Sequence, residues 1–169
     1  TIDSNNLRIL LHVLTGASGP AADHAVVRQR YEVPEGFSLE LYEADLPKAR
    51  FLALTPAGDL LVSRPHSGDI VLLRHDDNED GKPDGRETLI EGLKRPQGMT
   101  FHDDWLYIAE SNRISRVHFN SATGTLEGSL QPVVEGLTDN GNHWSKTIRI
   151  GNDEKLYLAQ GSTCNVCDE

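Results

Sequence analysis

The stretch FLALTPAGDLLVS, residues 51–63, sets the pattern that the rest of this 169-residue chain repeats. A short apolar run leads into a turn that contains Gly58 and Asp59, and a second apolar run begins at Leu60. Short apolar runs separated by Gly, Asn or Asp are typical of antiparallel strands joined in a hairpin. Since the pattern returns further along the chain, residues 51–63 are the first unit of a repeat.

The repeat returns at residues 98–109 and 147–159, where a polar turn with Asp again lies between two strand-like runs. The leucines that open the second run, Leu60, Leu106 and Leu156, lie 46 and 50 residues apart. A period of about 40 to 50 residues with several short strands per unit is typical of β-propeller blades. Helical patterning is nearly absent beyond residue 50, so the sequence predicts an all-β fold.

The number of repeats predicts part of a propeller. Residues 31–169 hold about two blades and the opening hairpin of a third, whereas propellers usually close with four to eight blades. An open wedge would leave long unpaired strand edges. We therefore expect a fragment of a larger protein, one piece of a cleaved protein, or a protomer that closes by assembly, and we prefer the first two. Residues 1–30 are expected to form a short irregular or helical N-terminal extension.

The acidic segment DDNEDGKPDGRE, residues 76–87, has the oxygen pattern of a twelve-position calcium loop. Gly81 stands where such a loop turns sharply, and the last residue can close the shell with both carboxylate oxygens. Position 7 would offer its main-chain carbonyl. The alternative is a solvated acidic hairpin without metal. The candidate ligands are Asp76, Asn78, Asp80, Lys82, Asp84 and Glu87.

The residues before this segment favour strands over the helices of an EF-hand. Residues 68–74 contain a short run of Ile, Val and Leu at 70–73, and Pro65 lies just upstream. Such a run indicates a strand. The sequence thus predicts an acidic loop between two strands, in which calcium would have a structural role.

The composition excludes two classes of partner and suggests a location. Asp and Glu number 26 against 16 Lys and Arg, and this acidity disfavours nucleic acid and anionic membranes. No run of eighteen apolar residues is available to span a bilayer. The chain begins at Thr1 without Met, which fits a processed protein, although trimming would look the same. We expect a periplasmic or secreted location.

The two cysteines form one Cys164-x-x-Cys167 motif. Haem attachment would need His at the next position, where Asp168 stands, and zinc would need two further ligands at motif spacing. A redox-active pair usually lies at the start of a helix in a βαβ unit, and the sequence around this motif does not predict such a unit. With export expected, a small structural disulfide between Cys164 and Cys167 is the preferred interpretation.

Several motifs resemble the glucose/sorbosone dehydrogenase family, along residues 31–169. The resemblance implies a six-bladed propeller that oxidises a sugar or sugar aldehyde with pyrroloquinoline quinone (PQQ) and calcium. It also implies three partners: a sugar substrate, an electron acceptor such as a cytochrome, and the remaining blades or another chain that completes the fold. The motifs are YEVPEGF at 31–37, LPKARFLALTPAGDLLV at 46–62, the acidic segment at 76–87, RPQGM at 95–99, GNH at 141–143 and GSTCNVCDE at 161–169.

The resemblance assigns roles to three residues. His143 matches the general base, Gln97 matches a position that contacts the cofactor or the base, and Asn142 stands where the family often has Asp. Arg64, just after the strand-like run 60–63, can face either the top of the channel with the cofactor or the surface. The cations that clamp the quinone carboxylates would come from later blades, outside this chain.

Two other functions remain open from the sequence. A calcium-dependent lactonase-type hydrolase also uses a propeller, but it needs Glu, Asn and Asp residues that converge on the inner strands. A non-catalytic binding propeller would carry the repeats without a histidine loop beside a cofactor-sized opening.

Overall fold

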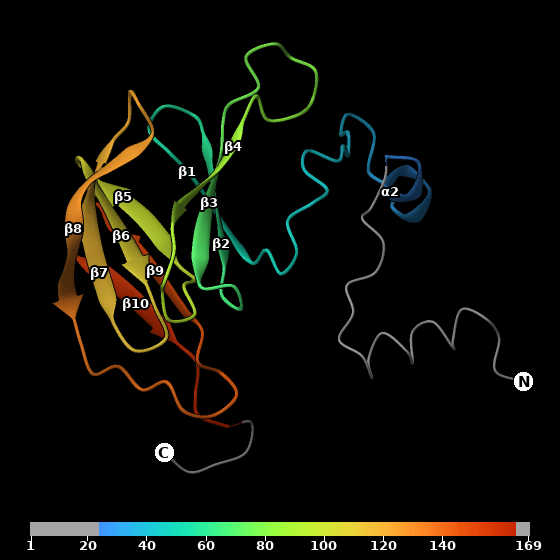
Figure 1. The fold of residues 1–169 in the computed structure, drawn as a ribbon. Helices are drawn as coiled ribbons and strands as arrows, with labels where there is room; N and C mark the ends of the chain where they lie inside the picture. Colours follow the sequence, from blue (N-terminus) through green and yellow to red (C-terminus); the bar gives the residue numbers. More distant parts are fainter. Residues whose placement is uncertain (1–23, 165–169) are drawn as a thin grey trace, which may run out of the picture. The chain divides into compact units, whose positions relative to one another are not determined.

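The computed structural model describes residues 24–164, whose ten strands form three antiparallel sheets (Figure 1). The chain divides into two compact units, residues 1–47 with 79–82 and residues 48–78 with 83–169. The described part of the first unit holds the helix α2, His24–Arg30, and irregular chain up to residue 47. No helix within residues 24–164 is long and apolar enough to cross a membrane.

The first sheet contains four strands in chain order, each antiparallel to the next. Its first hairpin is closed by two main-chain hydrogen bonds, from Thr55 N–H to the Asp59 carbonyl at 2.8 Å and from Gly58 N–H to the Thr55 carbonyl at 3.0 Å. Gly58 has φ of 95°, a conformation that glycine adopts at little cost. The strands are β1 (Phe51–Leu54), β2 (Leu60–Arg64), β3 (Asp69–Leu73) and β4 (Arg86–Ile90).

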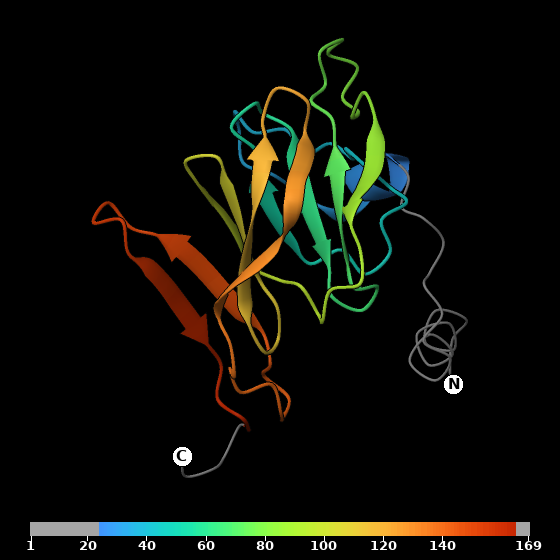
Figure 2. The ribbon, with the colours of Figure 1, turned by 60° about the vertical axis from the view of Figure 1, so that its left-hand side comes forward.

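The second sheet repeats this order, and the third is the two-stranded start of the same unit. Figure 2 shows the three sheets side by side in chain order, and the inner strands contact one another, β1 with β5 and β5 with β9. This arrangement confirms the predicted all-β propeller fragment of two blades and an opening hairpin. The remaining strands are β5 (Met99–His102), β6 (Trp105–Ala109), β7 (Ile114–Asn120), β8 (Thr125–Val134), β9 (Lys146–Ile150) and β10 (Leu156–Gln160).

The core lies between successive sheets. Leu61, Ile70 and Leu72 of the first sheet pack with Leu106 and Ile108 of the second, and all five are 0% exposed. A smaller cluster joins the second sheet to Ile148 of β9. Each such side chain contributes about 1.5–3 kcal/mol by leaving water, so the blades are held to each other mainly by apolar contact.

The strands at the edges of the sheets differ in which side chains they expose to solvent. The outer strand β8 is mostly exposed, contains Pro132, and pairs with β7 in an irregular register. On β10, Tyr157 is 56% exposed and Leu158 37%, while β1 exposes Leu52 and Leu54. Apolar side chains are therefore exposed on the first and last strands of the array.

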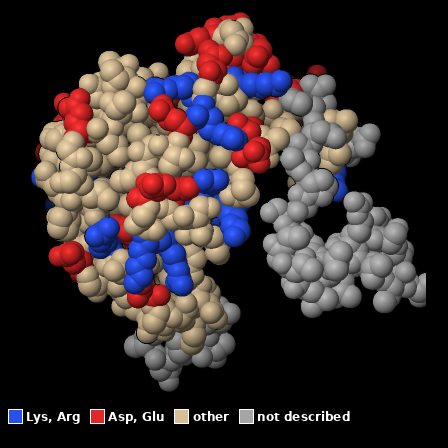
Figure 3. All heavy atoms as spheres, in the orientation of Figure 1, with Lys and Arg blue, Asp and Glu red and all other residues tan. Residues whose placement is uncertain are grey.

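Antiparallel strands place their connections alternately at two ends of the sheets. We call one end the histidine end; it consists of residues 65–68, 91–98, 110–113, 135–145 and 161–164. The other, the acidic end, consists of residues 55–59, 74–78, 83–85, 103–104, 121–124 and 151–155. Figure 3 shows acidic side chains gathered on the loop that follows β3, at the acidic end.

Candidate active site

His143 lies at the histidine end, in the loop between β8 and β9, and its side chain is half-buried. Its Nδ1 is 3.1 Å from the main-chain carbonyl oxygen of Ser162. A carbonyl oxygen only accepts, so Nδ1 carries the hydrogen and Nε2 of the neutral ring keeps its lone pair. In the neutral ring, the contact thus selects the tautomer in which Nε2 can accept a proton.

The segments 141–143 and 161–163, two motifs of the family resemblance, pack against each other through their main chains. Asn142 N–H donates to the Thr163 carbonyl at 3.2 Å. A Cβ atom at Gly141 would lie 2.0 Å from the Thr163 oxygen, and one at Gly161 would lie 2.7 Å from His143 Cβ. Both glycines are needed for this close approach, which sets the position of His143.

Gln97, the second predicted site residue, is only 2% exposed at the end of the loop that leads into β5. Its N–H donates to the Ala109 carbonyl at 2.8 Å, whereas its side-chain Oε1 is buried and has no hydrogen-bond partner within the described residues. An unpaired buried oxygen costs about 1–3 kcal/mol. Such an atom at the same end as His143 is a candidate contact for a bound molecule.

Arg64 also lies at the histidine end, at the last position of β2. Its guanidinium pairs with Asp69 across the β2–β3 turn, with Nε 2.8 Å from Oδ1. The pair fixes Arg64 within its own blade, and a role for Arg64 in cofactor binding stays a prediction.

Trp144, next to His143, is half-buried between two residues from other loops. The Arg95 guanidinium lies 4.9 Å from the centre of the indole ring, and the His66 ring meets the indole edge-on at 6.3 Å between centroids. The cation–π contact links the RPQG motif to the histidine loop. Trp144 is thus packed between loops and is not a fully buried core residue.

Ion pairs join the loops of the histidine end. Lys94 Nζ lies 2.6 Å from Asp139 Oδ2, and Ser111 Oγ lies 3.3 Å from the same oxygen. The hydrogen bond from Lys94 is the main reason that the pKa of Asp139 lies below its usual value. These contacts tie the loop that carries His143 to the two loops beside it.

Glu110 and Lys146 are charged residues of this end that the sequence did not single out, and each is 1% exposed. Glu110 accepts the Lys94 main-chain N–H at 2.7 Å and pairs with Arg113. The hydrogen bond between the Arg113 and Glu110 side chains raises the pKa of Arg113. In the sequence, Glu110 directly follows an apolar run and Lys146 directly precedes one. Neither position indicated that the side chain would be buried.

The acidic segment joins β3 to β4, as predicted, but several of its predicted ligands are already bonded. Asp84 accepts the Asp77 main-chain N–H at 3.0 Å and the Asn78 side-chain nitrogen at 2.6 Å. The Asn78 nitrogen therefore faces this carboxylate. Glu87 pairs with Arg74. In this arrangement the side chains of Asn78, Asp84 and Glu87 are bonded to other groups, so they do not form a coordination shell for calcium.

The middle of the segment shows a tight turn. Gly81 has φ of 82°, as a sharp turn requires, and Lys82 N–H donates to Asp80 Oδ1 at 2.9 Å. Across residues 24–164, no three His, Cys, Asp or Glu side chains are placed to hold one metal ion. Calcium binding by Asp76, Asn78, Asp80, Lys82, Asp84 and Glu87 stays a prediction.

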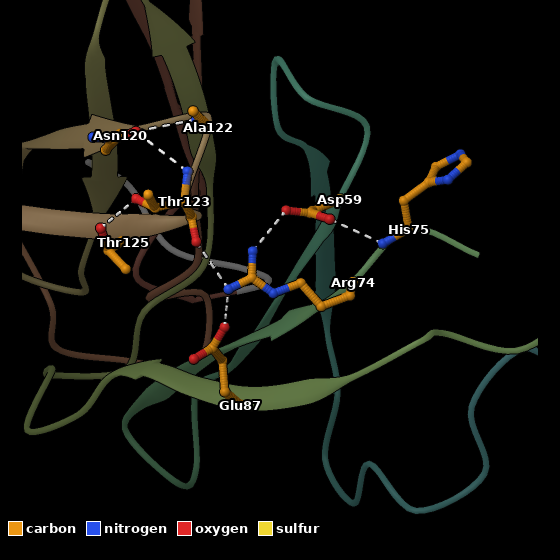
Figure 4. A network of polar contacts seen from close by, with 8 residues as sticks. All are labelled: Asp59, Arg74, His75, Glu87, Asn120, Ala122, Thr123 and Thr125. Carbon is orange, nitrogen blue, oxygen red and sulfur yellow. Dashed lines mark hydrogen bonds and ion pairs between the residues drawn. The ribbon is translucent and has the colours of Figure 1, made fainter. Parts of the chain in front are cut away.

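Arg74 is the centre of a polar network at the acidic end (Figure 4). Its guanidinium contacts Asp59 at 3.3 Å, Glu87, and the Thr123 carbonyl at 3.0 Å. Asp59 also accepts the His75 main-chain N–H at 2.9 Å. Because Thr123 lies in the turn between β7 and β8 of the second blade, Arg74 joins the first two blades at the end opposite to His143.

Cys164 closes the described part of the chain, and Cys167 lies outside the described residues. The Cys164–Cys167 disulfide therefore stays a prediction.

No curated protein matches the chain, whereas several solved structures do. A calcium structure of the Trichoderma reesei carbohydrate-active enzyme of family AA12 is 22% identical, with a TM-score of 0.68 over 78% of this chain and 34% of that one. The holo PQQ domain of pyranose dehydrogenase from Coprinopsis cinerea is also 22% identical, with a TM-score of 0.70 over 81% and 34%.

A third similar structure is the PQQ-bound aldose sugar dehydrogenase of Streptomyces coelicolor, 24% identical with a TM-score of 0.51 over 70% of this chain and 39% of that one. This chain thus spans about a third of the length of the structures it matches. The likenesses show the propeller fold, and they agree with the resemblance to quinoprotein sugar dehydrogenases. Residues 31–169 match the TrAA12-like family, and the chain belongs to it.

Proposed function

We propose that the complete protein oxidises a sugar or sugar aldehyde with PQQ, and that His143 is the general base. The observation that carries the proposal is the contact between His143 Nδ1 and the Ser162 carbonyl, which leaves Nε2 as the proton-accepting atom. The similar structures include a PQQ domain and a PQQ-bound enzyme, which supports the choice of cofactor.

The reaction removes one proton and one hydride from the substrate. Nε2 of His143 takes the proton of the hydroxyl group on the sugar carbon, while the hydrogen on that carbon leaves with two electrons. PQQ, when bound, would supply the hydride acceptor. For a cyclic sugar the product is a lactone, and the two electrons pass on to an external acceptor such as a cytochrome. A positioned general base typically contributes about 10²–10⁴ in rate.

The described residues fit part of a cofactor site. Oε1 of Gln97, buried and without a partner among residues 24–164, fits a donor group on a bound molecule, and Asn142 holds its loop against Thr163. Arg64 would have to loosen its pair with Asp69 to take part. These three residues would hold or orient the cofactor on the side of His143.

The rest of the protein would complete the site. The chain spans about a third of its structural relatives, and exposed Leu52, Leu54 and Tyr157 offer apolar surface for further blades. We propose that these blades, or another chain, supply the cations for the quinone carboxylates. A periplasmic or secreted location would suit a sugar substrate and an external electron acceptor.

The test uses the full-length protein with PQQ and calcium added. PQQ binding is followed by absorbance, and turnover by a redox dye with a panel of free aldoses. His143→Gln keeps a donor for the Ser162 carbonyl but lacks a base, so we expect turnover to fall by about 10²–10⁴ with little change in PQQ affinity. His75→Gln is the matched control, since the His75 side chain is 56% exposed at the acidic end.

Two results would contradict the proposal. Equal turnover in wild type and His143→Gln would remove His143 as the base. A wild-type protein that does not bind PQQ would belong with the lactonase-type hydrolases or the binding propellers.

A further inference from the structure

Lys146, at the first position of β9, is the largest fully buried side chain of the described residues, with 1% exposed. A buried ammonium is costly unless it is hydrogen-bonded. Its Nζ donates to two main-chain carbonyls, Thr138 at 2.7 Å and Trp144 at 3.2 Å. Burial lowers the pKa of Lys146, and the nearby Asp139 carboxylate opposes this shift. Because burying an ammonium group costs free energy, a buried lysine in this position is expected to have a specific structural or functional role.

The two acceptors of Nζ bracket the loop that carries the candidate base. Thr138 lies before Asn142 and His143 in the chain, and Trp144 lies directly after them. One ammonium group therefore holds both ends of this loop at a single point. The middle of the loop is held separately by the contacts of Asn142 and His143 with residues 162–163.

The main chain of Lys146 is also the junction with the second predicted site residue. Its carbonyl accepts the Gly98 N–H at 3.0 Å, and Gly98 follows Gln97 directly. A Cβ at Gly98 would lie 2.8 Å from this carbonyl oxygen, so the two inner strands approach as closely as glycine permits. Lys146 thus connects the histidine loop to the segment that carries Gln97.

We propose that Lys146 is a positioning residue, which clamps the loop 138–144 through the Thr138 and Trp144 carbonyls and so holds Nε2 of His143 in place against the substrate. The inference rests on the proposed function for its effect on turnover, but the clamp itself is a property of the loop. Loss of the clamp releases the loop ends, and a misplacement of about 1 Å can cost about 10²-fold in rate.

The experiment compares wild type, Lys146→Met and Lys146→Arg in the full-length protein with PQQ. Met has a similar length and donates nothing, whereas Arg can still donate to carbonyls. Lys155→Met is the matched control, because the Lys155 side chain is 76% exposed in the turn between β9 and β10. The readouts are kcat and KM for an aldose and hydrogen–deuterium exchange of the peptide that spans residues 136–146.

In Lys146→Met we expect exchange in residues 139–145 to rise about tenfold or more, since two hydrogen bonds to a charged donor are lost. We expect kcat to fall by about 10- to 100-fold with KM nearly unchanged, and Lys146→Arg to regain part of both. Wild-type exchange in this peptide would overturn the proposal, as would a rise of equal size in all peptides.

Failure of both variants to fold would also overturn the proposal, because Lys146 would then act on the whole fold. A wild-type protein without PQQ-dependent turnover would contradict the proposed function alone, and the exchange measurement would still decide whether Lys146 clamps the loop.

Discussion

The two ends of the sheets join neighbouring blades by different means. At the acidic end, the guanidinium of Arg74 reaches across to Thr123 with its ion-pair partner Glu87 half exposed. At the histidine end, several joints are buried: Glu110 and Lys146 are each 1% exposed, and Gly98 lies against the main chain of β9. The Arg74–Glu87 pair and the Arg74–Thr123 contact of the acidic end are exposed, and exposed ion pairs are worth little individually.

The histidine end adds two buried charged groups, Glu110 and Lys146, to more exposed contacts such as the Lys94–Asp139 ion pair. Removing one member of a buried ion pair leaves the other charge uncompensated. The loss in unfolding free energy is then well above that for a surface pair. Buried contacts of this kind suit loops that must hold a base and an amide in fixed positions. The contrast predicts different responses to matched changes at the two ends.

The largest contrast is expected for the two glutamates. Glu110→Gln removes the partner of Arg113 from a buried site, and the loss in unfolding free energy should be about 2–3 kcal/mol, below the full buried value because Arg113 is 37% exposed. Glu87→Gln should cost about 0–1 kcal/mol, since Glu87 is 49% exposed. Urea unfolding of the two variants makes the comparison. Equal losses would show that the ends do not differ in this way.

Two glycines give the next contrast. Ala at Gly98 would meet main-chain atoms of Lys146 and Ile148 at 2.8 Å, which cannot move aside, and should cost about 1–3 kcal/mol. Ala at Gly85 would meet side-chain atoms and no main-chain atom, Arg74 Cγ at 3.1 Å and Arg74 Cβ at 3.7 Å. We expect a change within about 0.5 kcal/mol there. Thermal unfolding decides, and a larger loss in Gly85→Ala would reverse the argument.

Within this chain, calcium should act on the acidic end, and weakly. Binding at residues 76–87 has to break the hydrogen bond between Asn78 and Asp84, so we expect a Kd of about 10⁻⁴–10⁻³ M. At 10 mM calcium this affinity stabilises by about 1–3 kcal/mol. Calorimetry of wild type and Asp84→Asn is the measurement. The absence of heat in wild type would leave the acidic segment a solvated hairpin.

The last contrast is a change of stability with pH. The pKa of Lys146 is lower in the folded protein than its ordinary value of 10.5, so the unfolded chain binds more protons between the two values. Stability should therefore rise with pH through that window in wild type. Lys146→Met should lack this rise, whereas Lys155→Met should keep it. Unfolding measured from neutral pH to pH 10.5 tests the sign.

The fold was predictable because the signal repeats. The runs that open at Leu60 and Leu156 became β2 and β10, and Leu106 is the second residue of β6. The acidic segment lies between two strands, as the Ile, Val and Leu run before it indicated. Local apolar pattern and turn residues decide these features, so a single sequence suffices.

The site was predictable only where motifs carried it. The motifs GNH at 141–143 and GST at 161–163 are separate in the sequence, and the structure brings them together through Gly141 and Gly161. Lys146 was missed because a lysine after a polar loop reads as exposed; its burial depends on the approach of Gly98, which is distant in sequence. Arg74 and Thr123 were missed for the same reason, since they meet only after two blades pack.

The edges of the fragment carry a consequence for its behaviour in solution. Pro132 and the irregular register make the outer strand β8 a poor template for another chain. The strand β10 pairs with β9 alone among the described strands, and it exposes Tyr157 and Leu158. Regular unpaired strands with apolar side chains recruit further strands. Expressed alone, residues 31–169 should therefore self-associate through β10, and Leu158→Lys should keep them monomeric.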